Sequence, residues 1–163
     1  MESPWGWRSK AGKEGSLSQI KTRRMDRDEK KTVKDFSGQE LRGKDFSGQD
    51  LSRANFESSD IRDSNFSNCN LEEASFVMTF ASRVDFSNAN MKNVHMKRII
   101  ADNANFAQAD MSGADLSAGN FIKANFKGTI WSELTKLTGA DMKGVETSQI
   151  DISKVDTSKT FFD

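Results

Sequence analysis

The sequence predicts an all-β fold in which the chain winds as a four-sided parallel β-helix of about five coils. Three observations predict it. Large apolar residues recur every five residues from Phe36 to Trp131, small or β-branched residues stand two places before them, and Asp or Asn commonly stands one place before them. A helical face recurs every 3.6 residues and a strand face every two, so neither explains a period of five.

The central positions of this repeat are large and apolar in eighteen of twenty units. If each unit forms one side of a square, four units make a coil of twenty residues, and each centre stacks on the centre twenty residues earlier. We therefore expect the centres and the small residues before them to form the core. Asp or Asn precedes the centre in fourteen of the twenty units, and we assign these residues, with Ser and Gly, to the tight corners that they favour.

Several units match the pattern A-[DN]-[LF]-x-x closely, among them Ala54-Asn55-Phe56, Ala104-Asn105-Phe106 and Ala114-Asp115-Leu116. Over residues 35–131 the sequence resembles the pentapeptide-repeat family. The resemblance implies a right-handed quadrilateral β-helix, a handedness that the spacing alone does not establish.

Both flanks depart from the repeat, and the ends of a stacked fold need caps. After Trp131, residues 132–137 suit a short helical turn, and the next clear centre, Met142, comes eleven residues after Trp131, so the register slips by one. We predict that residues 132–163 form a C-terminal cap or a degenerate last coil.

Residues 1–34 form a polar, basic arm without the repeat, either extended or with a short helix. Trp5 and Trp7 stand in this arm, and tryptophan is frequent among the anchors of protein interfaces. Three interpretations stay open: an N-terminal cap, a flexible tail, and an arm that binds a partner.

The repeat also fails inside the rod. Ala81 and Ala101 are the only small centres among the twenty, and they stack on one face because they are twenty residues apart. Phe80 and Ile100 precede them, where Asp or Asn is usual. We favour a local shift that turns Phe80 and Ile100 inward, since two alanines would otherwise leave a void that costs several kcal/mol.

The alternative is an apolar partner surface on the outside of the rod. Its residues are Val77, Met78, Phe80 and Ile100, with Lys97 and Arg98 beside them.

The composition excludes several classes of site. Lys plus Arg and Asp plus Glu both number 24, so the net charge does not call for nucleic acid or an anionic membrane. The single cysteine, Cys69, and the single histidine, His95, cannot form a disulfide or a Cys/His zinc site. We expect Cys69 to be a buried small apolar residue and His95 an outward surface residue. We expect no catalytic residue, metal, cofactor or transmembrane segment.

The leading hypothesis is a non-catalytic scaffold or subunit of a larger complex that binds other proteins through the arm and the apolar face. The alternative is a mimic of DNA that inhibits an enzyme such as gyrase, because the resemblance extends to gyrase-protecting proteins with strongly negative faces. Arg53, Arg62, Arg83 and Arg98 interrupt any such face here. The distribution of the family implies a plastid or thylakoid setting, and otherwise we expect a soluble cytoplasmic protein.

Overall fold

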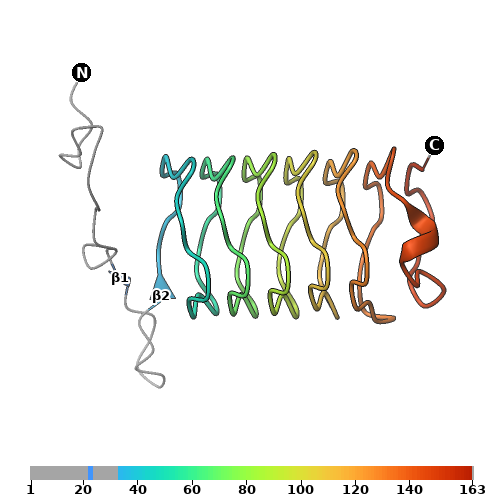
Figure 1. The fold of residues 1–163 in the computed structure, drawn as a ribbon, viewed down its shortest axis with the longest axis horizontal. Helices are drawn as coiled ribbons and strands as arrows, with labels where there is room; N and C mark the ends of the chain where they lie inside the picture. The colour runs from blue at the N-terminus through green and yellow to red at the C-terminus, as the bar shows by residue number, and fades with distance from the viewer. Residues whose placement is uncertain (1–21, 24–32, 163) are drawn as a thin grey trace.

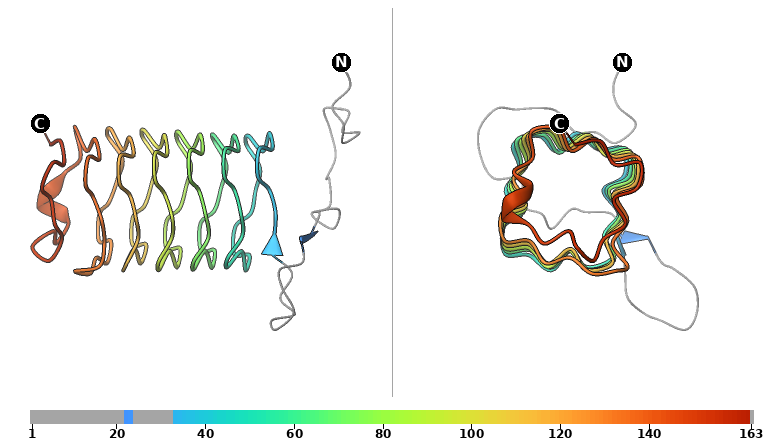
Figure 2. Two further views of the ribbon diagram at one scale, coloured as in Figure 1. Left: turned by 180° about the vertical axis from the view of Figure 1, so that it is seen from behind. Right: turned by 90° about the vertical axis from the view of Figure 1, so that its right-hand side faces the viewer.

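The chain winds into a straight rod of stacked coils in the computed structural model, which describes residues 22–23 and 33–162 (Figure 1). The view along the rod shows four sides that lie over one another from coil to coil (Figure 2). Two short strands, β1 (Thr22–Arg23) and β2 (Val33–Lys34), pair antiparallel at the N-terminal end. A 3-10 helix, η2 (Thr147–Gln149), lies near the C-terminal end. The predicted arm of residues 1–34, with Trp5 and Trp7, lies largely outside the described residues.

Parallel backbone bridges join each side to the side twenty residues later, from Asp35 with Asn55 to Asp110 with Ile130. The central N–H of a side donates to the next coil, as Phe36 N does to Asn55 O at 2.7 Å. The residue before a centre donates to the previous coil, as Asn55 N does to Lys34 O at 2.9 Å. The coil of twenty residues predicted from the repeat is therefore the unit that the hydrogen bonds build.

The Asp and Asn residues before each centre stabilise the corners without standing in them. Their carboxylate or amide oxygens accept the backbone N–H two residues later, as Asp45 Oδ1 does from Ser47 N at 3.0 Å. Asn side chains also bond to one another along the rod, and Asn90 Nδ2 donates to Asn70 Oδ1 at 3.0 Å. The second corner residue takes a positive φ in coil after coil, including non-glycine residues such as Asn68 at 59°, a conformation that Asn tolerates better than most residues.

Stacks of phenylalanine fill the N-terminal half of the core. Phe46 and Phe66 have ring centroids 4.6 Å apart, and Phe66 and Phe86 5.4 Å. Rings on adjacent sides meet edge to face, as Phe66 and Phe76 do at 5.9 Å. Such geometries are the favourable ones for aromatic pairs, so the stacking adds to the burial that the period of five provides.

The register slips by one residue after Trp131, where the sequence places the slip. The bridges run from Asp115 to Lys136 and from Asn120 to Asp141, a spacing of twenty-one. The helical turn predicted at 132–137 is wrong: these residues make a non-helical turn at 133–134 and then rejoin the coil. One inserted residue is absorbed by a wider corner, because Leu137 can then return to the core, where it is fully buried.

The coil continues well past Trp131. Bridges join Lys136 with Asp156 and Asp141 with Phe161, so two sides of the rod carry another coil beyond the stretch that the repeat pattern marked. The other two sides depart from the stack at residues 145–152, which include η2. After the slip the central positions of these two sides fall on Thr147 and Ile152, and among the described residues neither side forms a bridge to the preceding coil.

Replacing a stacked phenylalanine should therefore cost much of the stability. We expect Phe66→Ala to lower the free energy of unfolding by about 3–5 kcal/mol, the usual cost of removing a buried phenylalanine. Urea unfolding followed by circular dichroism measures it. Lys44→Ala, at an exposed position, is the control and should change the value by less than about 0.5 kcal/mol. A loss of under about 1 kcal/mol for Phe66→Ala would contradict the stacked core.

Candidate functional site

Three of the large apolar side chains that the structure exposes lie together on one face of the rod. The exposed fractions are 50% for Met78, 45% for Phe80 and 38% for Ile100. Phe80 bridges to Ile100 in the next coil, and Val77, beside Met78 at the same corner, is half-buried. We call Val77, Met78, Phe80 and Ile100 the Phe80 patch.

The predicted inward shift of Phe80 and Ile100 is wrong. Phe80 keeps its place in the ladder, where Phe80 N donates to Ser59 O at 3.0 Å and Phe80 O accepts from Ile61 N at 2.9 Å. Completing the burial of a half-exposed phenylalanine would gain about 1 kcal/mol. Leaving two buried backbone groups without partners would cost about 1–3 kcal/mol each. The ladder therefore outweighs the burial and holds Phe80 outward.

The alanine centres remain in the core, since Ala81 and Ala101 are both fully buried. The opposite side of the same coils carries Met91 and Met111, which are also fully buried. Methionine is long and flexible, and it suits irregular space in a core. Methionine opposite alanine thus accounts for the space that the sequence analysis expected an inward-turned Phe80 to fill.

A partly buried ion pair lies beside Phe80. Asp60, only 6% exposed, stacks directly before Phe80 in the ladder. Arg62 Nε donates to Asp60 Oδ1 at 2.8 Å, and a second bond joins Arg62 Nη2 to Asp60 Oδ2. The guanidinium carbon of Arg62 lies 5.8 Å from the Phe80 ring centroid, within the range of a cation–π contact.

Arg62 was not singled out from the sequence as part of this site. The twenty-residue spacing that puts Asp60 before Phe80 was the signal that would have found it. The hydrogen bond from Arg62 holds the pKa of Asp60 below its usual value. Phe80 is therefore framed by a fixed cation on one side and an apolar neighbour on the other.

The basic pair predicted beside the patch differs in its contacts. The exposed Lys97 places its Nζ 3.4 Å from Oδ2 of the buried Asp115. Arg98 is exposed, and within 33–162 no carboxylate lies within ion-pair distance of it. It stands at the corner position twenty residues after Met78. The patch therefore has a cationic edge that the described chain does not neutralise.

The fold does not require apolar residues at positions 80 and 100. On most sides the Asp or Asn at this position accepts a corner N–H, as Asp85 Oδ1 does from Ser87 N at 2.9 Å. Phe80 and Ile100 have no such oxygen. The two residues give up a repeating hydrogen bond and expose apolar surface, and neither change benefits the free rod.

The remaining candidates have ordinary positions. Cys69 is buried, and its Sγ lies 3.0 Å from Phe46 O; burial raises the pKa of the thiol. His95 is exposed, and it bridges to Ser75 of the preceding coil. Among the described residues no three His, Cys, Asp or Glu side chains are grouped to hold a metal. Nor does any helix there have the length and hydrophobicity to cross a bilayer.

Charge on the outer faces is mixed. Arg83 binds Asp63 through two bonds of 2.6 and 2.9 Å, and Arg53 binds Glu73 at 2.8 Å. Of the four rows of residues that bridge from coil to coil, one contains two acids in succession, Glu40 and Asp60. Phe80 follows them in that row and ends the acidic run. A continuous acidic face of the kind that DNA mimicry requires is therefore not formed by these rows.

Comparison with known families identifies the repeat. The model for pentapeptide repeats matches residues 35–68, 64–100 and 101–130, more than half of the chain. The chain belongs to the pentapeptide repeat family. The Phe80 patch lies within the matched pentapeptide repeats, and its residues Phe80 and Ile100 occupy positions where the repeat favours Asp or Asn.

Solved structures of other pentapeptide repeat proteins resemble it. One from the cyanobacterium Cyanothece 51142 is 15% identical, with a TM-score of 0.58, over 79% of this chain and 91% of its own. HetL from Nostoc sp., involved in heterocyst differentiation regulation, is 14% identical, with a TM-score of 0.56, over 68% of this chain and 62% of its own. The chain thus spans less than two thirds of HetL. These two likenesses show the fold alone.

A pentapeptide repeat protein from the Arabidopsis thaliana thylakoid lumen is 33% identical over 68% of this chain and 69% of its own, with a TM-score of 0.35. No curated protein sequence matches the chain.

The ion pair beside Phe80 predicts a pH dependence. Because the folded pKa of Asp60 is lowered, its contribution to stability is present above the unfolded pKa of about 3.9 and is lost as the pH falls through the folded value. We expect Asp60→Asn to be less stable than the parent at neutral pH and the difference to shrink below about pH 4. Urea unfolding of both proteins across this range measures it, and a constant difference would contradict the assignment.

Cys69 should resist modification in the folded protein. A buried thiol with a raised pKa is mostly protonated at neutral pH, and the thiolate is the reactive form. We expect a thiol reagent such as 5,5′-dithiobis(2-nitrobenzoate) to label Cys69 only when denaturant unfolds the chain. Rapid labelling at neutral pH without denaturant would show that the thiol is accessible.

Proposed function

We propose that the protein is a non-catalytic interaction subunit and that the Phe80 patch is the surface through which it holds a partner protein. The observation that carries the proposal is the exposure of Met78, Phe80 and Ile100 together, at positions that the repeat does not require to be apolar. Contiguous apolar surface on a rigid protein favours association, because burying it on binding is favourable and needs little ordering of the backbone.

The surroundings indicate the chemistry of the partner. Arg62 is engaged by Asp60 and holds its guanidinium over Phe80, whereas Arg98 is exposed beside Met78 without a carboxylate partner in the described coils. A partner that places an apolar side chain against Phe80 and Ile100 and a carboxylate against Arg98 would complement both features.

Inhibition of a DNA-binding enzyme by mimicry is less well supported, because the arginines paired with Asp63 and Glu73 break up the negative charge. The plastid or thylakoid setting and membership of a photosynthetic complex also remain proposals. A role for the arm with Trp5 and Trp7 is likewise a proposal, and it rests on the sequence alone.

Asparagine substitution separates the role of the patch from the stability of the rod. We expect the double variant Phe80→Asn, Ile100→Asn to change the free energy of unfolding by less than about 1 kcal/mol, as is usual for exposed positions. Asn is also the residue that the repeat prefers there. In affinity purification from the native source, we expect the same variant to lose partners that the parent retains.

Ile130→Asn is the matched control. Ile130 is 54% exposed and occupies the same repeat position on another side of the rod, so it should retain those partners. Identical partner lists for the parent and the double variant would refute the assignment of the patch. A large loss of stability in the double variant would instead show that Phe80 and Ile100 serve the fold.

A further inference from the structure

On two sides of the rod, the backbone hydrogen bonds between coils stop one coil before the C-terminal end. In the preceding coil Phe106 N donates to Asn125 O at 2.7 Å, and Gln108 N donates to Lys127 O at 2.9 Å. The equivalent donors one coil later are Phe126 N and Gly128 N, and neither has an acceptor among the residues that the structure describes. Two backbone donors with the spacing of a strand partner are therefore left at this edge.

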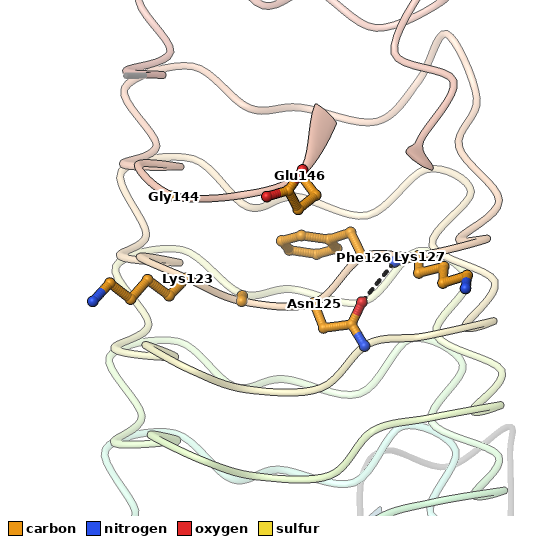
Figure 3. Close-up of a pocket in the computed structure, with 7 residues that line it drawn as sticks. Lys123, Asn125, Phe126, Lys127, Gly144 and Glu146 are labelled. Atoms are coloured by element: carbon orange, nitrogen blue, oxygen red, sulfur yellow. Dashed lines mark hydrogen bonds between the residues drawn. The ribbon is translucent and has the colours of Figure 1, made fainter. Parts of the chain in front are cut away.

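A pocket of about 190 Å³ lies at the same edge (Figure 3). Lys123, Asn125, Phe126 and Lys127 line it from the last regular coil, and Gly144 and Glu146 line it from the segment beyond. In the close-up the Phe126 ring lies below Glu146, with Lys123 and Lys127 at opposite ends. The central N–H of each earlier side points to the next coil, so Phe126 N–H is directed toward this gap.

A third unsatisfied donor lies on the neighbouring side of the coil. Trp131 is 8% exposed, its ring centroid lies 5.3 Å from that of Phe126, and its buried Nε1 has no hydrogen-bond partner. Buried polar groups without partners are uncommon in folded proteins. The end of the rod thus combines unused backbone donors, an unused indole donor and a cavity.

We infer that this edge binds an extended polypeptide segment of a partner protein, which adds as the next parallel strand. The ligand class follows from the donors: in a complete coil the equivalent N–H groups receive the carbonyl oxygens of residues i and i+2 of a side that runs into a corner, as Phe106 N and Gln108 N receive Asn125 O and Lys127 O. Strand addition to an exposed sheet edge is an established mode of peptide recognition. The lysines at the two ends of the pocket favour a segment with acidic side chains.

The segment 145–149 lies beyond this edge and, among the described residues, shares no backbone hydrogen bond with 124–130. Its central residue, Thr147, is exposed, and no bridge joins this side to the preceding coil. An incoming strand can therefore replace this segment without breaking ladder bonds. The inference concerns the end of the rod and is independent of the Phe80 patch.

A peptide copied from the rod itself tests the inference. In residues 101–110, Asn105 O and Ala107 O accept from Phe86 N at 2.7 Å and Asn88 N at 2.9 Å, so this segment presents the required carbonyl spacing. With the free protein we expect the Phe126 and Gly128 amide hydrogens to exchange at least about tenfold faster than those of Phe106 and Gln108. Adding the blocked 101–110 peptide at millimolar concentration should slow both, and a scrambled peptide should not.

The variant Thr147→Leu tests the same edge with the protein's own segment in place of the peptide. A large apolar centre should draw 145–149 onto the edge, protect the Phe126 and Gly128 amides without peptide, and abolish the peptide response. Ser148→Leu, which adds the same side chain one exposed position later, should leave the response intact. Equal amide protection in the free parent, no response to the peptide, or the same effect from both leucine variants would each overturn the inference.

Discussion

The backbone ladder between residues twenty apart is the constraint on which the rest of this structure depends. It fixes which side chains stack, which face outward, and where a change of register can be absorbed. A single bond such as Ala81 N to Ile100 O, at 2.7 Å, contributes little by itself. Because three such bonds join nearly every side to the next coil with one repeated geometry, turning one residue inward would disrupt several of them together.

This constraint explains which features the sequence predicts and which it does not. The period of five places Phe36, Phe56 and Phe76 in one stack, and it predicts a buried Cys69 and an outward His95, because the pattern and the ladder agree there. At Phe80 they conflict: hydrophobicity favours the core, and the ladder favours the surface. Composition cannot show which prevails, since the deciding terms are backbone hydrogen bonds that do not depend on the side chain.

The C-terminal end was predicted less well for a related reason. The sequence shows the slip after Trp131, but Ser132 to Leu137 has the composition of a helical turn as well as that of a wide corner. What decides is that Lys136 and Asp141 can still pair with residues twenty-one earlier. The contacts of Arg62 with Asp60 and Phe80 are likewise set by stacking between coils. Such contacts become predictable only after the register is known.

The same rigidity gives the two proposed surfaces different chemistry. On the side of the rod the ladder uses most backbone groups, so a partner recognises mainly side chains, and Phe80 with Ile100 supplies them. At the end of the rod the donors of Phe126 and Gly128 are free of ladder partners in the described chain, so recognition there can use the backbone. The departure of residues 145–149 from the stack leaves these donors unpaired. A β-helix can thus acquire a second binding surface where one side leaves the ladder, without a new loop or domain.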